Sequence, residues 1–363
     1  MADRGNALLR FLDRVFGIPV VFFVGLFSRR RKVPENIESI GVLAIAAIGD
    51  TILLSAVLRD LQSALGEVKL TVFCSRGNSA AVQLSTEKIS QIIIPVKNPL
   101  KAVRLIRQSR FDVFIDFGQW PRLNSLLSFA SRSRCHIGFR TIGQYRHYGY
   151  DIAVAHRRDC HELDNFRRLL EPLDIESRSL PSLGTAEPDN SNPYIVVHIF
   201  PSGYKAHYKK WSDANWIKLI RELNRLGYKV LLTGSAADSS AAKRIAAACG
   251  TDSMESGLIE VKAGSTSLAE LATLLRKAQA VVSVNTGVMH LAAAYNQRLI
   301  ALHGPTSVLR WGPLCEHKYN LTASTKSAGC LHLGFEYDRR DPRSMDTIHP
   351  DRVLEALRKL LSG

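Results

Sequence analysis

The sequence predicts two α/β domains, each built around a parallel sheet, with a linker between them. Its 363 residues exceed the size at which one hydrophobic core usually stays single. Short apolar runs alternate with amphipathic stretches in two separate series, a pattern typical of βαβ units. Between the series, residues 176–193 are rich in Ser, Pro and Asn and lack helical periodicity, so we place the linker at 181–193.

The first series defines a lobe over residues 38–180. Its expected strands are 40–48, 69–74, 91–96 and 113–117, and its expected helices are 52–65 and 100–109. The second series defines a lobe over residues 194–350, with expected strands at 194–199, 229–233, 280–284 and 298–303 and expected helices at 214–226, 236–249, 268–277 and 288–295. A final helix within 351–363 can pack on either lobe. Open α/β folds bind ligands at the carboxyl ends of their strands, so functional residues are expected at strand-to-helix turns.

The net charge and the cysteine content limit the classes of partner and the kinds of site that this protein can have. Lys and Arg exceed Asp and Glu by 48 − 33 = 15, which favours a polyanionic partner such as nucleic acid, anionic lipid or a phosphorylated sugar. The six cysteines form no CxxC pair, so neither a zinc site nor a disulfide framework is indicated, and a reducing cytoplasm is the simpler location. The arginines are not interleaved with stacking aromatics, so no nucleic-acid partner is expected.

The amino-terminal segment, residues 1–37, has an unusual pattern. From Val15 to Phe27 it contains no charge, and the basic cluster 29–32 follows almost at once. The apolar stretch is too short to span a bilayer, and a signal peptide would carry its basic residues before it. We therefore expect an interfacial membrane anchor whose basic cluster meets anionic headgroups. The alternative is a helix packed against the protein's own surface.

The most specific motif lies in the second lobe, where strand 280–284 ends in Asn285-Thr286-Gly287. Backbone N–H groups at the start of the next helix, together with the Thr286 hydroxyl, form a ready site for a phosphate. Gly287 permits close approach of a ligand, and His290 lies one turn into the helix. The alternative is an ordinary capped turn with a core histidine.

Two other strand ends of the second lobe carry matching chemistry. Gly304 and Thr306 lie in a turn after strand 298–303, so two neighbouring strands end in hydroxyl-containing loops across which a diphosphate can lie. The loop after strand 194–199 holds three lysines, among them Lys209, and a lysine there can neutralise a departing diphosphate. Lys-rich loops are more often only solvated, which is the alternative.

In the first lobe, Asp50 follows strand 40–48 in a Gly-Asp-Thr turn. A carboxylate at that strand end can act as a general base. The alternative is that Asp50 only caps the following helix. The turn lacks GxGxxG and GxxxxGK[ST], so neither a dinucleotide dehydrogenase nor a P-loop site is indicated. Further along, residues 132–168 hold eight arginines against four acidic residues, which fits either a site for a phosphorylated or carboxylated acceptor or a solvated surface.

Taken together, these motifs resemble those of the ADP-heptose:lipopolysaccharide heptosyltransferases, glycosyltransferase family 9. The matching segments are the Gly49-Asp50 turn, Lys209-Lys-Trp211, residues 283–290, and His303-Gly-Pro-Thr306 followed by Trp311-Gly-Pro313, in matching order over about residues 38–350. The resemblance implies a GT-B fold, with two Rossmann-like lobes whose parallel sheets face a central cleft. The first lobe would bind the acceptor and the second the nucleotide sugar.

The resemblance also implies roles for single residues. Asp50 would be the general base of an inverting transfer, and Lys209, with the amides around Thr286 and Gly287, would stabilise the diphosphate leaving group. The implied donor-binding residues are Ser202, Asp238 (ribose), Thr266 (adenine), Asn285, Thr286, Gly287, His290, Gly304 and Thr306, and the candidates for acceptor binding are Arg122, Arg140 and Arg146. No metal and no cofactor are expected. The family usually has Asp where this chain has Asn285, which leaves the identity of the donor sugar open.

The expected partners are an ADP-sugar donor, a lipopolysaccharide-core or other glycolipid acceptor, and an anionic membrane surface. The expected location is cytoplasmic, peripheral on the inner face of the bacterial inner membrane. Three alternatives stay open: a glycosyltransferase that uses a different sugar nucleotide, a sugar-nucleotide epimerase of the same architecture, and a sugar-nucleotide or lipid-binding regulatory protein without catalysis.

Overall fold

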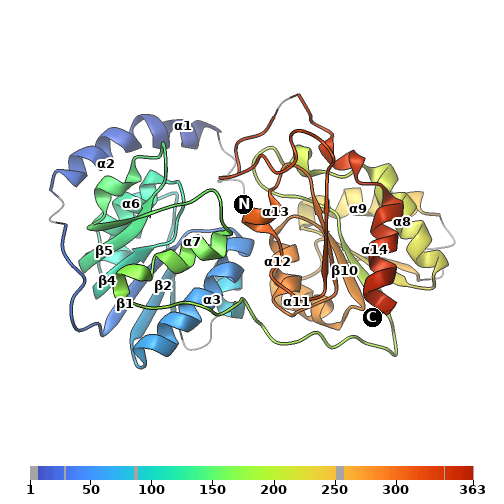
Figure 1. Ribbon diagram of the computed structural model, residues 1–363, viewed down its shortest axis with the longest axis horizontal. Helices are drawn as coiled ribbons and strands as arrows, with labels where there is room; N and C mark the ends of the chain where they lie inside the picture. Colours follow the sequence, from blue (N-terminus) through green and yellow to red (C-terminus); the bar gives the residue numbers. More distant parts are fainter. Residues whose placement is uncertain (1–6, 28–29, 86–88, 251–256, 339, 363) are drawn as a thin grey trace. The chain divides into compact units, whose positions relative to one another are not determined.

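The chain folds into two compact units, Met1–Leu180 (unit 1) and Pro181–Gly363 (unit 2), each with its own sheet (Figure 1). The computed structural model describes residues 7–27, 30–85, 89–250, 257–338 and 340–362, with side chains from residue 11 onward. All strand pairs within the two sheets are parallel. The two parallel sheets expected from the sequence are therefore confirmed.

The sheet of unit 1 has six strands in the order β3-β2-β1-β4-β5-β6. The strands are β1 (Ser39–Ala44), β2 (Lys69–Cys74), β3 (Ser90–Ile93), β4 (Arg110–Asp116), β5 (Arg132–Arg140) and β6 (Ile152–Ala155). The helices are α3 (Ile48–Leu65), α4 (Ser79–Ser85), α5 (Pro99–Ile106), α6 (Arg122–Phe129) and α7 (Glu162–Arg168), with a 3₁₀ turn η1 (Arg146–Gly149). One core layer joins α5 and α6 to the aromatic side chains Phe73, Phe111 and Phe114 of the sheet. On the other side, α3 packs against α4 and α7.

The arginine-rich stretch 132–168 contains strands and a helix that the sequence analysis did not predict, and five of its eight arginines are exposed, as the solvated-surface alternative stated: Arg132, Arg134, Arg140, Arg157 and Arg158. It supplies β5, β6 and α7. At the start of β5, exposed Arg132 and Arg134 alternate with buried Ser133 and Cys135. This is the period-2 pattern of a strand with one solvated side, but its inward residues are too small and polar to read as an apolar run.

The sheet of unit 2 repeats the same connectivity, in the order β12-β11-β10-β7-β8-β9. Its strands are β7 (Tyr194–His198), β8 (Lys229–Thr233), β9 (Ile259–Val261), β10 (Ala280–Val284), β11 (Leu299–His303) and β12 (Lys318–Thr322). Its helices are α8 (Asp213–Arg225), α9 (Ser239–Ala248), α11 (Leu268–Lys277), α12 (Gly287–Ala293), α13 (Val308–Trp311) and α14 (Pro350–Ser362). The expected helix 236–249 begins with a 3₁₀ turn, η4 (Ala236–Asp238), before α9. Strands β9 and β12 were not expected.

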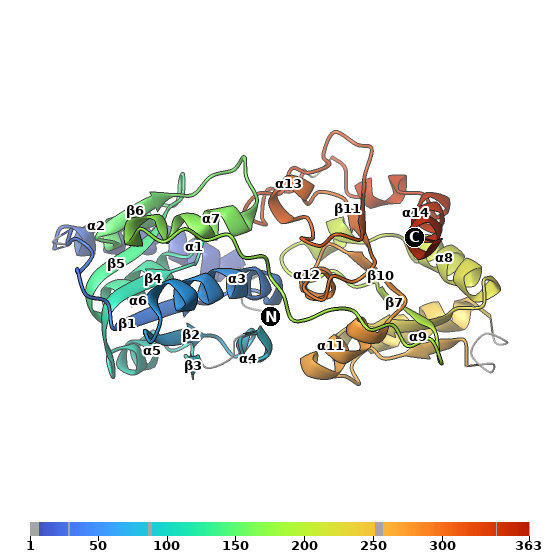
Figure 2. The same ribbon diagram turned by 60° about the horizontal axis from the view of Figure 1, so that its bottom comes forward.

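The final helix packs on unit 2, where Figure 2 shows α14 beside α8. Buried Val353, Leu354 and Leu357 join the core that contains Trp211 and Trp216. The two tryptophan rings meet edge to face at 4.7 Å, and the Trp211 indole N–H donates to the Ile348 carbonyl at 2.8 Å. The question that the sequence left open, which lobe carries this helix, is thereby settled.

The segment before β7 has no helix or strand between Leu173 and Tyr194. Its backbone runs along unit 2, because the amides of Glu187 and Asp189 donate to the carbonyls of Arg276 and Lys277 at the end of α11, each at 2.9 Å. These bonds satisfy carbonyls that every helix leaves without an intrahelical partner at its carboxyl end.

Before β1, the chain forms α1 (Ala7–Val15) and α2 (Gly17–Gly25), which pack on α6 and η1 (Figure 1). The contact stripe is Asp13, Gly17, Val21 and Gly25, spaced four residues apart, so all four face the same side of the helices. Gly17 lies against the Arg122 side chain and Gly25 against Tyr148, where a Cβ would come within 2.6 Å of the Tyr148 Cβ. Glycine is therefore required for this close approach.

Asp13 fixes the stripe to unit 1. One carboxylate oxygen accepts the backbone N–H groups of Arg122 and Leu123 at 3.0 and 3.2 Å, which caps α6 where Pro121 has no capping side chain. The other accepts the Arg122 guanidinium at 2.9 Å, and that side chain is only 4% exposed. The inner stripe therefore packs on the protein's own surface, which was the alternative in the sequence analysis.

The outer side of α1 and α2 is apolar and exposed. Its large side chains, from 37% to 78% exposed, are Phe11, Leu12, Val15, Phe16, Val20, Phe22, Phe23, Leu26 and Phe27. No described helix has the length and apolarity needed to cross a membrane. Of the expected basic cluster, Arg29 lies outside the described residues, Arg30 is exposed, and Arg31 pairs with Asp151 at 3.2 Å.

We predict that Asp13→Ala lowers the free energy of unfolding of unit 1 by about 3 kcal/mol, because it removes a helix cap and leaves a buried guanidinium unpaired. Asp13→Asn should cost less, since an amide oxygen still caps α6. Urea unfolding measures both. Asp159→Ala, which breaks an exposed pair with Arg157, serves as the control and should cause no measurable change. Equal stability of Asp13→Ala and wild type would contradict the capping role.

Candidate active site

The candidate site of unit 1 lies where its strand order reverses, between β1 and β4. These neighbours pair in register through Leu43 and Asp116. The connections after two such strands run in opposite directions, which leaves the carboxyl edge of the sheet open between them. Asp50, in the turn after β1, and Asp116, the last residue of β4, therefore lie at the edge where ligands of this architecture bind.

Asp50 sits in the first turn of α3 and is 7% exposed. Its carboxylate accepts the Ala47 backbone N–H at 3.1 Å. The neighbouring Thr51 hydroxyl donates to the Ala47 carbonyl at 2.9 Å and accepts from the Asn78 amide at 3.0 Å. The helix-capping role, given as the alternative, is therefore confirmed, and the role of general base stays a prediction about a carboxylate held rigidly at the strand end.

Asp116, which the sequence interpretation missed, forms a buried cluster with Arg146 and Tyr150. The Arg146 guanidinium donates to Asp116, to the Tyr150 hydroxyl and to the Gly118 carbonyl, and the Tyr150 hydroxyl donates to Asp116 at 2.6 Å. Burial disfavours the charged guanidinium, but Asp116 and Tyr150 hold the pKa of Arg146 above its ordinary value. Burial also raises the pKa of the Tyr150 hydroxyl, which stays protonated as a donor. The sequence did contain one signal for Asp116, since it is an acidic residue near the end of the apolar strand 113–117.

The three arginines expected to bind an acceptor have different surroundings. Arg146 has no exposed surface, and its donors are used within unit 1. Arg122 is 3% exposed and pairs with Asp13. Arg140, at the end of β5, is exposed, and together with Arg30 it contributes to lowering the pKa of His147, an effect due first to burial. Arg140 therefore presents a guanidinium to solvent, whereas the other two hold the structure together.

The candidate site of unit 2 lies at the equivalent reversal, between β7 and β10. The two strands pair through His198 and Ser283, so the loops after them leave the same edge. In the loop after β7, Lys209 is half-buried, and its ammonium donates to the carbonyl of exposed Ser202 at 2.8 Å. Burial lowers the pKa of Lys209 to about 8, because a desolvated ammonium without a carboxylate partner among the described residues is destabilised.

The loop after β10 carries Asn285, Thr286 and Gly287, all half-exposed. Asn285 donates from its side-chain amide to His303 at 3.1 Å and to the Trp311 carbonyl at 2.9 Å. The Thr286 hydroxyl has no hydrogen-bond partner among the described residues, which is uncommon for a hydroxyl shielded from water. His290 is 5% exposed in α12 and belongs to the interior, as the alternative for it stated.

Gly304 and Thr306 follow β11, the next strand outward. A Cβ at Gly304 would come within 2.5 Å of the Met345 sulfur, so the packing of that residue requires glycine here. Thr306 is 7% exposed and pairs with Leu331 in an isolated bridge. Both positions are thus explained by packing, while their backbone still forms the strand-end loop.

Asp238 and Thr266 lie beyond β8 and β9, further from the reversal point. Asp238 accepts the Ser235 backbone N–H at 2.9 Å and the Ser235 hydroxyl at 2.6 Å, so its carboxylate closes the turn before α9. Thr266 directly precedes Ser267, the cap of α11. The structure places both on the carboxyl edge of the sheet, as the order of strands requires.

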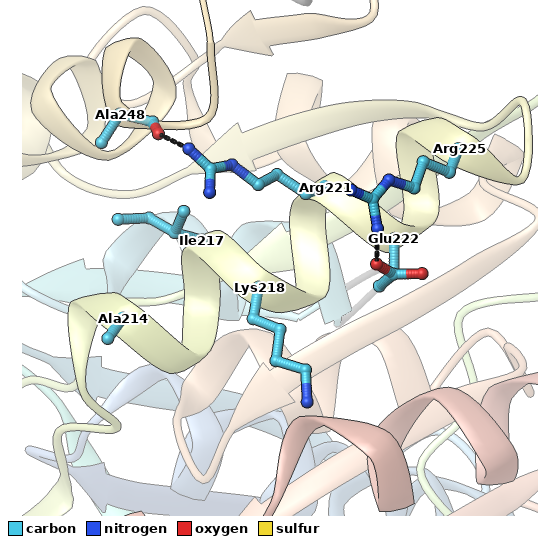
Figure 3. Close-up of a pocket in the computed structure, with 7 residues that line it drawn as sticks. All are labelled: Ala214, Ile217, Lys218, Arg221, Glu222, Arg225 and Ala248. Carbon is cyan, nitrogen blue, oxygen red and sulfur yellow. Dashed lines mark hydrogen bonds and ion pairs between the residues drawn. The ribbon is translucent and has the colours of Figure 1, made fainter.

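A hollow of about 550 Å³ lies along α8 and is unrelated to these strand ends (Figure 3). Its three cationic side chains are already paired: Lys218 with Asp351, Arg221 with the Ala248 carbonyl and Arg225 with Glu222. The described residues also contain no cluster of three or more His, Cys, Asp or Glu side chains placed to hold a metal ion. The candidate residues of both units lie instead at the carboxyl edges of the two sheets.

Comparison with known proteins agrees with this architecture. The chain matches the family described as glycosyltransferase family 9 (heptosyltransferase) over residues 100–337. It is 33% identical over 200 residues to lipopolysaccharide heptosyltransferase 2 of Salmonella typhimurium, which is 53% of this chain and 55% of that protein. It is 27% identical over 291 residues to lipopolysaccharide heptosyltransferase 3 of Escherichia coli, 73% of this chain and 79% of that protein. The chain thus spans only about half the length of the Salmonella relative.

The fold is similar to that of E. coli ADP-heptose lps heptosyltransferase II, with a TM-score of 0.73 at 22% sequence identity, covering 89% of this chain and 98% of that one. Two Rossmann-like units of the GT-B type, as the resemblance implied, are confirmed. The family match covers well over half of the sequence and includes the motifs of unit 2. The chain therefore belongs to glycosyltransferase family 9, the heptosyltransferase family.

Proposed function

We propose that this protein is an inverting glycosyltransferase that moves a heptose or a related sugar from an ADP-activated donor to a lipopolysaccharide-core acceptor. The relatives named above are lipopolysaccharide heptosyltransferases. The observation that carries the proposal is Lys209, a half-buried cation in the loop that follows β7, the strand that pairs with β10 at the reversal point of unit 2. A desolvated ammonium gains more from a diphosphate than a solvated one does.

In the proposed reaction, Asp50 removes the proton of an acceptor hydroxyl as its oxygen attacks the anomeric carbon of the donor. The bond from that carbon to the ADP oxygen breaks, and the configuration inverts because attack and departure occur on opposite faces. The cap to Ala47 restrains the Asp50 carboxylate, so little reorganisation is needed when the acceptor arrives.

The leaving diphosphate is proposed to bind Lys209 and the backbone around Thr286 and Gly287. The Thr286 hydroxyl, which has no partner in the described structure, would donate to it. Ser202, His290, Gly304 and Thr306 would line the same edge, Asn285 would contact the sugar, Asp238 the ribose and Thr266 the adenine. The proposal needs no metal ion, since the protein supplies the cation.

We predict that Asp50→Asn lowers acceptor-dependent ADP release by about a hundredfold or more, since an amide cannot accept the proton. The assay combines purified protein, ADP-heptose and delipidated lipopolysaccharide core. Asp112→Asn is the matched control. Asp112 also accepts backbone N–H groups of unit 1, from Glu38 and Ser39, but it lies at the opposite end of β1, so this variant should keep full turnover.

The same assay separates the alternatives. Turnover with UDP- or GDP-sugars instead of ADP-sugars would show that the protein uses a different donor from the one proposed. Consumption of donor without acceptor would indicate an epimerase or hydrolase. Binding without any turnover would indicate a regulatory protein and would refute the proposed transfer.

We predict that ADP affinity falls as the pH rises above about 8. Diphosphate binding favours the protonated ammonium of Lys209, so affinity is full below the pKa of about 8 and declines by up to about tenfold per pH unit above it. Lys209→Arg should abolish this decline, because a guanidinium stays charged. Lys210→Ala, at the exposed neighbour, should retain it. Calorimetric titration of ADP at several pH values tests this, and a decline that persists in Lys209→Arg would remove Lys209 from the site.

The acceptor side is proposed to face a membrane, at the cytoplasmic surface of the bacterial inner membrane. The exposed outer side of α1 and α2 bears Phe16, Phe23 and Phe27, each more than 60% exposed. Exposed Arg14 and Arg30 flank this surface. An apolar helix face with adjacent cations is the arrangement that lies in the headgroup region of an anionic bilayer.

We predict that the full chain sediments with vesicles that contain phosphatidylglycerol and that Phe16→Ser/Phe23→Ser weakens this binding at least tenfold. The matched control, Ile93→Ser/Leu100→Ser, removes two exposed apolar side chains elsewhere on unit 1 and should bind like wild type. High salt should weaken binding, because it screens the cations. Equal sedimentation of the two double variants would refute this docking surface.

A further inference from the structure

Asn285 ties together the two strand-end loops of unit 2. Its backbone N–H donates to the Leu302 carbonyl at 3.1 Å, which joins the ends of β10 and β11. Its side-chain amide nitrogen donates to His303 Nδ1 at 3.1 Å and to the Trp311 carbonyl, after Thr306, at 2.9 Å. Both hydrogens of that nitrogen are therefore used inside the protein.

The Trp311 carbonyl fixes the direction of every hydrogen bond in this chain of groups. A carbonyl only accepts, so the Asn285 side chain must present its nitrogen on this side. His303 Nδ1, bonded to the same nitrogen, must then be the bare acceptor. The proton of the neutral ring is left on Nε2, which lies 3.0 Å from Asn320 Oδ1 on β12 and donates to it. The sequence of partners thus sets both the amide orientation and the histidine tautomer.

His303 is held in this neutral form by its surroundings. It has no exposed surface at the end of β11. Burial lowers its pKa to about 4, and the hydrogen bond that His303 donates to Asn320 acts in the other direction. A proton added to Nδ1 would also point at the Asn285 nitrogen, which has no lone pair to accept it.

With its nitrogen engaged, Asn285 has one polar atom left. Its Oδ1 makes no hydrogen bond to any described residue, and the side chain is half-exposed at the edge from which the proposed diphosphate loops leave. This oxygen is uncharged and can only accept. A hydroxyl fits it, whereas a carboxylate or phosphate oxygen does not, because two acceptors repel.

We propose that His303 and Asn320 are positioning residues that aim the Asn285 side-chain oxygen at a hydroxyl of the donor's glycosyl group, so that this protein selects an uncharged, hydroxyl-bearing sugar over a carboxylated one. This deepens the proposed function and rests on it. The two residues act through Asn285 and touch no substrate atom themselves. Their effect is confined to the sugar, since the nucleotide is held by other groups.

The first test compares ADP with an ADP-sugar in calorimetric titrations. His303→Phe keeps a planar ring but removes both hydrogen bonds, and Asn320→Leu removes only the acceptor for Nε2. In both variants, ADP affinity should stay within about twofold, whereas ADP-heptose affinity should fall about fivefold to tenfold, the range of one lost neutral hydrogen bond. Tyr319→Phe, at the neighbouring position of β12, is the control and should change neither. A parallel loss of both ligands, or of neither, overturns the proposal.

The second test needs no substrate and uses the full chain with ¹⁵N-labelled histidine. The His303 signal is identified by its absence from the His303→Phe spectrum. It should show a proton on Nε2 only and no titration down to about pH 5. Asn285→Asp places a carboxylate against Nδ1, which requires a proton there, so the pKa of His303 should rise by more than one unit. A wild-type ring protonated on Nδ1, or one that titrates near neutrality, overturns the positioning chain.

The two tests distinguish failure of the proposed sugar transfer from failure of the proposed positioning of Asn285. If no ADP-sugar binds while the histidine spectra agree, the proposed transfer fails but the orientation of Asn285 stands. If ADP-heptose binds and turns over while an ADP-sugar with a carboxylate binds equally well, the transfer stands and the selection of uncharged sugars fails.

Discussion

The reversal of strand order in each sheet is the constraint on which the candidate site depends. In both units the first and fourth strands of the series are neighbours, β1 with β4 and β7 with β10. Crossover connections from such a pair leave in opposite directions, so no connection covers the carboxyl edge between them. The turns that follow these strands must therefore satisfy their own polar groups. Asp50 does so with a cap, and the loop after β10 does so through the Asn285 side chain.

The two edges satisfy their polar groups in different ways, and this difference has electrostatic consequences. Unit 1 buries a charged pair, Arg146 and Asp116, whose desolvation is offset only because Tyr150 and the Gly118 carbonyl complete the hydrogen bonds. Unit 2 uses neutral groups, with Asn285 and His303 forming a chain without net charge. Lys209 is a half-buried cation of the loop after β7 and has no carboxylate within bonding distance among the described residues, so its ammonium is available to bind a diphosphate.

The sequence predicted the fold where apolar runs were uninterrupted. Strands β2, β8 and β10 and helix α11 have the expected bounds, because a buried parallel strand is apolar on both faces. It failed at β5, where the strand begins with exposed arginines that alternate with the small buried residues Ser133 and Cys135. Site residues at strand ends were predictable in position, since turn residues mark those ends. The partners of these residues were not predictable, because nothing in the spacing of Asp116, Arg146 and Tyr150 shows that the three are in contact. The sequence also does not distinguish Arg140, which is exposed in the structure, from Arg122 and Arg146, which are buried.

The amino-terminal segment is linked to the site of unit 1 through one short helix. Asp13 caps α6, and further along α6 the Asn124 amide donates to Asp116 at 3.4 Å. The next residue, Ser125, donates to the Arg146 carbonyl at 2.7 Å. The segment that exposes the phenylalanines and the edge that carries Asp116 are therefore both held by the first four residues of α6. Because neighbouring residues of one short helix make both sets of contacts, the packing of α1 and the hydrogen bonds that support Asp116 and Arg146 depend on the same structural element.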